Sequence, residues 1–264
     1  MKSRDTNTSD SGHDTGSGRH VPRLYLDAPL RAGEQIALEK SQAHRLVTVM
    51  RRREGDNVIV FNGRDGEFET TLSNVTKKAA RLDITGLLRS QGEPQQLTLA
   101  FAPLKHARLD YVAQKAAELG VAAIQPVITA HTNSPRFNAD KFRANVIEGT
   151  EQCGVLWVAD VREPLPLAKF LQSVPGNETL VHCDEAAPVA NPVVALRNVA
   201  MPVTVLIGPE GGFSGDERAA LRDHPRARAV SLGPRIMRAD TAAVAALSLV
   251  QTICGDWRKG SSSE

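Results

Sequence analysis

The stretches Leu206-Ile207-Gly208-Pro209-Glu210-Gly211-Gly212-Phe213-Ser214 and Leu232-Gly233-Pro234-Arg235-Ile236-Met237-Arg238-Ala239-Asp240-Thr241-Ala242 decide the fold of this chain. Each has the form of a short apolar strand that breaks into a loop rich in glycine and proline and then continues as a helix. Loops of this kind allow backbone groups to approach a small ligand. Because the two loops follow each other closely, we expect them to form one bipartite pocket.

The first loop follows residues 201–207, whose length and β-branched content are typical of a buried parallel strand. Its glycines lie at the carboxyl end of this strand, where ligands of open α/β sheets usually bind. Ser214 and Glu217 have the spacing of a capping box that begins the next helix. A plain strand-to-helix turn would show the same features, so the second loop is needed to favour a pocket.

The second loop lies between a short strand predicted at 229–232 and an alanine-rich helix predicted at 241–253. Within it, Arg235 and Arg238 flank the apolar pair Ile236 and Met237. Cations beside a pocket suit an anionic partner. This loop therefore shifts the interpretation from a simple turn to a ligand site.

Two further motifs, QKAAELG at 114–120 and EQCG at 151–154, accompany these loops. Together the four motifs resemble the ribosomal RNA small subunit methyltransferase E family, over roughly residues 21–257. The resemblance implies S-adenosylmethionine as cofactor and methylation of a uridine at N3 in 16S rRNA of the small ribosomal subunit. It also implies a homodimer and an α/β fold, with an N-terminal PUA-like β-barrel and a C-terminal SPOUT-type trefoil-knotted methyltransferase domain.

The chain divides into four segments. Residues 1–20 and 259–264 are polar tails that cannot bury enough apolar surface to order themselves. Short strands predicted at 35–38, 57–61, 67–72 and 80–84 favour a small barrel in residues 21–91. A polar, proline-broken segment follows. Residues 92–258 then begin with a strand at 97–102, a helix at 109–119 ending at Gly120, and a strand at 121–128, which form a βαβ unit.

Candidate cofactor residues come from both loops. Backbone amides and apolar walls at Gly208, Gly212, Leu232 and Met237 suit an adenine ring. Glu185, at the end of a strand predicted at 179–183, could bind the ribose hydroxyls or cap the next turn. The full cofactor set is Glu185, Ile207, Gly208, Gly212, Leu232, Gly233, Ile236 and Met237.

Arg238 and Glu210 are the candidate catalytic residues. A sulfonium methyl donor is electrophilic without a metal, so the enzyme mainly has to align donor and nucleophile. Arg238 could stabilise negative charge on the uracil oxygens. Glu210 could accept a proton, or it could only brace the loop by hydrogen bonds.

Basic residues must be concentrated on one face if this chain binds RNA, because its net charge is only +2. The densest cluster is His44-Arg45 with Arg51-Arg52-Arg53, which could also be a simple solvated run. A helix predicted at 41–50 buries Leu46, Val47 and Met50 and leaves Arg45 and Arg52 to face a partner. With the resemblance, the RNA-binding set is Arg23, His44, Arg45, Arg51, Arg52, Lys105 and Arg136.

Two positions depart from the family pattern. Val155 follows the EQCG motif where arginine is usual, and Asp240 stands where glutamate is usual. The first departure removes an expected RNA contact. The second departure keeps the negative charge, but the side chain of aspartate is shorter than that of glutamate.

Composition excludes several other classes of protein. Hydrophobic residues make up 41% of the chain, and no run approaches the ~20 apolar residues that span a bilayer. The N-terminus lacks the apolar core of a signal peptide. Cys153, Cys183 and Cys254 lack the close pairing of a zinc site. We therefore expect a cytoplasmic protein with reduced thiols, no membrane association and no metal.

Two alternatives stand beside this function. The chain could be a knotted methyltransferase acting on another RNA or on a ribose 2′-hydroxyl. It could also be a ribosome-associated RNA-binding protein that has lost catalysis. The glycines at 208–212 argue against the second alternative, because an inactive protein need not keep them beside a ligand.

Overall fold

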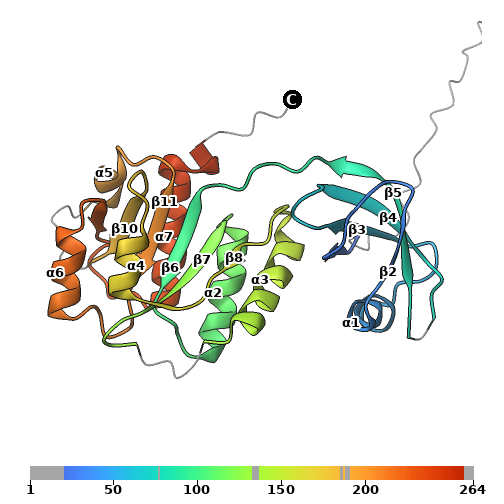
Figure 1. Cartoon of the computed structure of the whole chain (residues 1–264), viewed down its shortest axis with the longest axis horizontal. Helices are drawn as coiled ribbons and strands as arrows, with labels where there is room; N and C mark the ends of the chain where they lie inside the picture. Colours follow the sequence, from blue (N-terminus) through green and yellow to red (C-terminus); the bar gives the residue numbers. More distant parts are fainter. Residues whose placement is uncertain (1–20, 77, 133–136, 185–186, 188–190, 259–264) are drawn as a thin grey trace, which may run out of the picture.

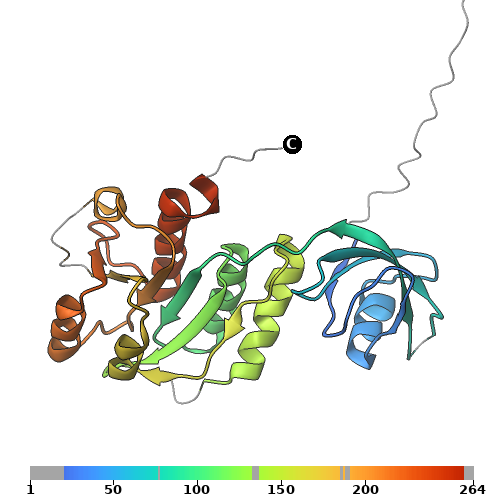
Figure 2. The same cartoon turned by 45° about the horizontal axis from the view of Figure 1, so that its top comes forward.

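The computed structural model describes residues 21–76, 78–132, 137–184, 187 and 191–258. Figures 1 and 2 show two parts side by side, a β-rich part that precedes β6 and an α/β part that follows it. In both views, α3 is the helix nearest to the β-rich part. The predicted boundary between residues 91 and 92 lies in the connection between the last strand of the first part and the first strand of the second.

The described residues of the N-terminal part form a five-stranded sheet in the order β1-β3-β4-β5-β2. Strand β1 runs parallel to β3, and the other neighbours are antiparallel. Alternate residues point into one core, which includes Leu24, Val58, Val60, Leu72 and Leu82. The elements are β1 (Arg23–Tyr25), β2 (Gln35–Ala37), α1 (Lys40–His44), η1 (Arg45–Val49), β3 (Asn57–Phe61), β4 (Glu67–Ser73) and β5 (Arg81–Arg89).

The helix predicted at 41–50 is divided. Helix α1 ends at His44 and continues as the π-helical turn η1, after which Arg51 adopts a φ of 54°. Leu46 is buried as predicted, but Met50 is 39% exposed because the wider π turn rotates it away from the core. The apolar stripe of this helix is therefore shorter than its sequence suggests.

The described residues of the C-terminal part form a parallel sheet in the order β12-β10-β11-β6-β7-β8, with β9 pairing with β7. Its first elements are β6 (Leu97–Phe101), α2 (His106–Glu118), β7 (Ala123–Ile128), α3 (Ala139–Cys153), β8 (Asp160–Val161), β9 (Leu165–Pro166) and α4 (Leu167–Ser173). The later elements are β10 (Thr179–Cys183), α5 (Pro192–Leu196), β11 (Val203–Ile207), α6 (Gly215–Asp223), β12 (Ala227–Val230), α7 (Ala239–Cys254) and η2 (Asp256–Arg258).

Both faces of this sheet are buried, as parallel sheets require. Leu99 and Phe101 of β6 join one core with residues of α2, α3 and α7, whereas Ala100 between them joins a second core with residues of α4 and α6. The chain then returns from β12, at the edge of the sheet, to α7, which packs against β11 and α2. This return is the course expected for the knotted class.

Most predicted elements are confirmed. Residues 179–183 form β10 as predicted, Gly120 follows α2 with a φ of 70°, and Ser214 and Glu217 form the capping box of α6. Strand β12 begins at Ala227, two residues before the predicted start. Helices α4 and α5 and strands β8 and β9 are too short to give a clear periodic pattern, and the sequence analysis missed them.

A buried ion-pair network joins the two parts. Arg23 and Arg89 both pair with Glu67 of the barrel. Arg23 also donates from Nη2 to the carbonyl of Val155 at 2.6 Å, and Arg89 donates from Nη2 to the carbonyl of Gly154 at 2.8 Å. The arginines thus bind the carbonyls at the C-terminal end of α3, where cations are favoured.

A second ion pair lies beside this network. Glu151 of α3 is 5% exposed and accepts hydrogen bonds from the Arg45 guanidinium and from the Tyr25 backbone N–H. The prediction that Arg23 contacts RNA does not fit its buried position, whereas the Arg45 side chain is 41% exposed and its RNA contact stays a prediction. The Arg23 side chain is only 8% exposed, with each of its three nitrogens hydrogen-bonded, and Arg45 is held by a buried carboxylate.

We predict that Glu67→Gln lowers the free energy of unfolding by about 3 kcal/mol, because it leaves the buried guanidinium of Arg23 without a carboxylate and also removes the half-exposed pair with Arg89. Burial alone would raise the pKa of Glu67, but hydrogen bonds from Arg89 and Arg23 outweigh it and lower that pKa below its ordinary value of 4.5. The charged carboxylate therefore stabilises the fold at pH values above 4.5. This stabilisation is lost as the pH falls from 4.5 through the lowered pKa of Glu67 in the folded protein. Urea denaturation from pH 7 down to about pH 3, which passes below the ordinary pKa of 4.5, measures both effects.

Glu34→Gln is the matched control, because Glu34 is exposed and its carboxylate lies 3.9 Å from Arg31. Such a surface pair contributes at most about 1 kcal/mol. Equal stability losses in the two variants would contradict the buried role of Glu67.

Candidate active site

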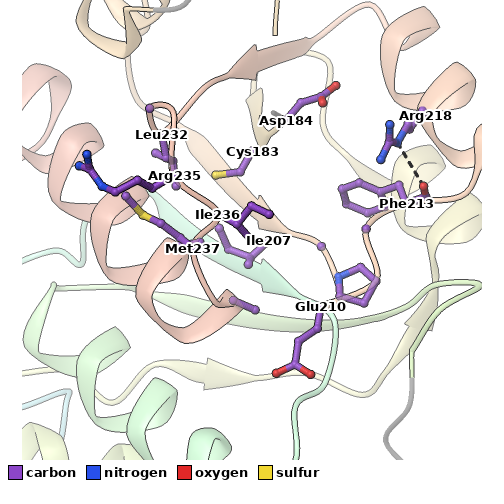
Figure 3. A pocket seen from close by; sticks show the side chains of 16 residues that line it. Cys183, Asp184, Ile207, Glu210, Phe213, Arg218, Leu232, Arg235, Ile236 and Met237 are labelled. Carbon is purple, nitrogen blue, oxygen red and sulfur yellow. Dashed lines mark hydrogen bonds between the residues drawn. The ribbon is translucent and has the colours of Figure 1, made fainter. Parts of the chain in front are cut away.

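A pocket lies at the carboxyl edge of the parallel sheet, where β10, β11 and β12 end (Figure 3). Parallel strands direct their carboxyl ends to the same edge, so the loops that follow them meet there. The described residues that line it are Cys183, Asp184, Ile207, Gly208, Pro209, Glu210, Gly212, Phe213, Arg218, Leu232, Gly233, Arg235, Ile236, Met237, Ala239 and Ala242.

The structure brings together almost all of the predicted cofactor residues. Glu210, the predicted proton acceptor or brace, lines the same pocket. The predicted cofactor residues found there are Ile207, Gly208, Gly212, Leu232, Gly233, Ile236 and Met237. The predicted Glu185 and Arg136 lie outside the described residues. The neighbouring Asp184 does line the pocket, so this segment contributes to it.

The glycines of the first loop allow close packing around the pocket. A Cβ on Gly208 would lie 2.9 Å from the Phe213 ring, which is closer than real side chains approach. Gly212 has a φ of 69°, which favours glycine, and its carbonyl accepts a hydrogen bond from the His131 ring in one tautomer. The loop therefore folds back on its own phenylalanine and leaves its backbone facing the pocket.

Arg108 connects both loops to α2. Its guanidinium forms an ion pair with Glu210 of the first loop, and its Nε lies 4.0 Å from the carboxylate of Asp240, at the start of α7. The family usually has glutamate at position 240, and the shorter side chain of Asp240 agrees with its long separation from Arg108. Of the two roles predicted for Glu210, this contact favours the bracing one.

Arg238 stands at the N-cap position of α7 and is exposed. It is not among the described residues that line the pocket, although it directly follows Met237, which does. Arg238 therefore lies next to the pocket along the chain, and its catalytic role stays a prediction.

Two side chains at the end of β10 are neutral at physiological pH. Burial raises the pKa of the Cys183 thiol to about 12, so the thiol stays protonated. Burial also lowers the pKa of His182, although the carboxylate of Asp184 opposes this shift. Asp184 and Glu210 therefore supply the negative charge of the pocket, and Arg218 and Arg235 supply the positive charge.

The sequence analysis missed Cys183, Asp184 and Arg218 as lining residues. Cys183 and Asp184 end and follow β10, and the rule that ligands bind at the carboxyl ends of parallel strands could have found them. Arg218 could not have been found in this way. It lies on α6, and only the turn between Phe213 and that helix brings it back to the pocket.

The remaining RNA-binding candidates are on the surface. His44 and Arg51 of the barrel are exposed, Arg52 is half-buried, and Lys105 is exposed immediately before α2. Val49 and Met50, beside Arg51, are also exposed. His44, Arg51 and Arg52 thus place basic side chains of the barrel near exposed apolar ones, whereas Lys105 belongs to the C-terminal part.

Among the described residues, no helix has the length and apolar character needed to cross a membrane. The same part of the chain contains no group of three or more histidine, cysteine, aspartate or glutamate side chains placed to hold a metal ion.

Comparisons with known families agree with this architecture. A family described as "RNA methyltransferase domain" matches residues 91–251, and one described as "RNA methyltransferase PUA domain" matches residues 38–85. The class defined by the fold and the pocket is therefore that of the RNA methyltransferases. The predicted combination of a PUA-like domain with a SPOUT-type α/β domain is confirmed.

Comparisons with individual proteins identify the family within this class of RNA methyltransferases. Ribosomal RNA small subunit methyltransferase E of Synechocystis is 30% identical over 83% of this chain and 73% of its own length, and that of Rickettsia conorii is 28% identical over 88% and 95%. The crystal structure of the Neisseria gonorrhoeae enzyme of that name, bound to S-adenosyl methionine, has a TM-score of 0.80 and 29% identity over 90% of this chain and all of its own. The chain belongs to the ribosomal RNA small subunit methyltransferase E family.

A second solved structure also carries the cofactor. A putative methyltransferase from Legionella pneumophila, in complex with S-adenosylmethionine, has a TM-score of 0.76 and 30% identity over 89% of this chain and 98% of its own.

We predict that Gly208→Ala lowers the free energy of unfolding by about 1–3 kcal/mol, because the added methyl overlaps the Phe213 ring. Urea denaturation measures the change. The control is Gly176→Ala, since a Cβ there meets nothing within 4 Å. If the two variants lose the same stability, Gly208 is not required by close packing.

Proposed function

We propose that this protein transfers the methyl group of S-adenosylmethionine to N3 of a specific uridine in 16S rRNA of the small ribosomal subunit, as a homodimer in the cytoplasm. The observation that carries the proposal is the convergence of the two glycine-rich loops on one pocket at the sheet edge. The names of the relatives and the cofactor bound in two solved structures support it.

The pocket suits an adenosine-containing cofactor. Ile207, Leu232, Ile236 and Met237 supply apolar walls for a purine ring. Glycines 208 and 212 expose backbone groups that can bind its edge. The carboxylates that follow β10, Asp184 and the predicted Glu185, suit the ribose hydroxyls or the amino group of the cofactor. These residues fit the chemistry of S-adenosylmethionine without a metal.

The bound cofactor supplies an electrophilic methyl group, and the protein has to align it with N3. Arg238, which directly follows the lining residue Met237, stabilises the negative charge that develops on the uracil oxygens when N3 loses its proton. Glu210 is paired with Arg108, so it braces the first loop against α2. Cys183 remains a neutral thiol and does not act as a nucleophile.

The barrel supplies RNA binding in this proposal. In this proposal, phosphates are contacted by His44, Arg51 and Arg52 of the barrel, by Lys105 before α2, and by Arg136. Arg23 and Arg45 hold the barrel on α3 and so join it to the domain that contains the pocket. Uridine N3 lies on the pairing edge, so the base must be unpaired to reach the cofactor.

We predict that the purified protein transfers label from S-adenosylmethionine to small ribosomal subunits or 16S rRNA, and that nucleoside mass analysis identifies N3-methyluridine. Arg238→Ala should lower the transfer rate at least about 100-fold, as for other oxyanion-stabilising groups, while cofactor affinity measured by calorimetry stays within about twofold. Arg222→Ala, an exposed arginine on α6, is the control and should retain full activity.

Other outcomes identify the alternatives. A 2′-O-methylated nucleoside, or label in transfer RNA alone, would replace the N3 assignment with another RNA methylation. Absence of cofactor binding would leave an RNA-binding protein without catalysis. Equal loss of cofactor affinity and transfer in Arg238→Ala would reject its role in the chemical step.

A further inference from the structure

The pocket has two chemically different ends. In Figure 3, Leu232, Met237 and Arg235 lie on one side, and Asp184, Arg218 and the Phe213 ring lie on the other. The first side comes from the loop before α7, and the second comes from the end of β10 and the start of α6. One side is therefore built mainly from aliphatic side chains, and the other presents a carboxylate and a guanidinium together.

Arg218 is held in place at the charged end. Its Nε donates to the Phe213 carbonyl at 3.2 Å, as the dashed line in Figure 3 shows. Its Nη2 lies 3.3 Å from the position that a Cβ on Gly212 would occupy, so this glycine leaves room for the guanidinium. The capping box of Ser214 and Glu217 fixes the start of the helix that carries Arg218.

The two Nη groups of Arg218 make no hydrogen bond or ion pair within the part of the chain that the structure describes. The side chain is thus oriented by one nitrogen and offers the other two to a partner. A guanidinium with two available nitrogens binds a carboxylate in a bidentate manner, with two parallel charge-assisted hydrogen bonds.

We infer that Arg218 binds the carboxylate of the methionyl end of S-adenosylmethionine, and that the negative charge of Asp184 faces the ammonium group of the same end. This inference rests on the proposed function. The methionyl end is a zwitterion, and Asp184 and Arg218 provide the complementary pair of charges on one side of the pocket. The purine then occupies the aliphatic side.

Arg235 is the other cation of the pocket and is a weaker candidate for this role. Both arginines are exposed, but Arg235 lies on the aliphatic side with Leu232 and Met237, away from Asp184. A carboxylate bound there would place the ammonium group far from the carboxylate of Asp184. Arg218 therefore fits the zwitterion better.

The test compares two ligands that differ by one carboxylate. Calorimetry with S-adenosylmethionine and with decarboxylated S-adenosylmethionine is performed on the wild-type protein and on Arg218→Ala, Arg218→Lys and Arg222→Ala. Arg218→Ala should weaken S-adenosylmethionine binding about tenfold or more, because a charge-assisted pair is lost, and should leave the decarboxylated ligand within about twofold. Arg218→Lys should recover part of the loss, and the Arg222→Ala control should match the wild type.

Each other result overturns the assignment. Unchanged affinity of Arg218→Ala for S-adenosylmethionine excludes a carboxylate contact. Equal weakening of both ligands shows that Arg218 only supports the loop through Phe213. If the wild type binds neither ligand, the proposed function itself fails, whereas selective loss of one ligand would confirm both.

Discussion

The parallel pairing of β10 with β11 on one side and β12 on the other is the constraint on which the site depends. It brings three strand ends to one edge, so loops distant in sequence share one pocket. Every residue of β11 is buried, and the strand contributes to the cores on both faces of the sheet. The packing of the sheet therefore fixes the ends of the loops. The residues within the loops are not needed for this packing and can contact a ligand.

A second constraint is the join between the barrel and α3. Buried Glu67 binds Arg23 and Arg89, which also donate to carbonyls at the end of α3, and buried Glu151 of α3 binds Arg45. This arrangement gives charged residues a positioning role. The carbonyl of Val155 accepts from Arg23, so the departure from the family arginine at this position still leaves its backbone in use at the join. The surface of the barrel that we propose to bind RNA is thereby joined to the domain that contains the pocket.

The sequence predicts the elements and both loops well, because apolar periodicity, glycine positions and capping residues are local properties. The capping box at Ser214 and the end of α2 at Gly120 are examples. The partners of charged residues are not local. Arg23 and Arg45 are basic residues of the type that binds RNA. In the fold, however, Arg23 pairs with Glu67, more than forty residues away, and Arg45 pairs with Glu151, more than one hundred residues away.

The same reason explains the missed residues of the pocket. Arg218 reaches the pocket only because the chain turns at Phe213, and Arg108, which is not a lining residue, supports the pocket from α2 through its ion pair with Glu210. A motif search identifies glycines at a ligand wall but cannot identify side chains that arrive from neighbouring helices. The resemblance to a known family supplied the knotted fold and the chemistry, which periodicity alone could not have supplied.

The central claim is that both loops form one cofactor site. The most direct measurement is a crystal structure of the protein with S-adenosylmethionine. The account predicts that one ligand contacts backbone of 207–213 and of 232–237 together. Ligand density elsewhere, for example in the groove between the barrel and α3 that Tyr25 and Arg45 line, with an empty pocket at the sheet edge, would contradict it.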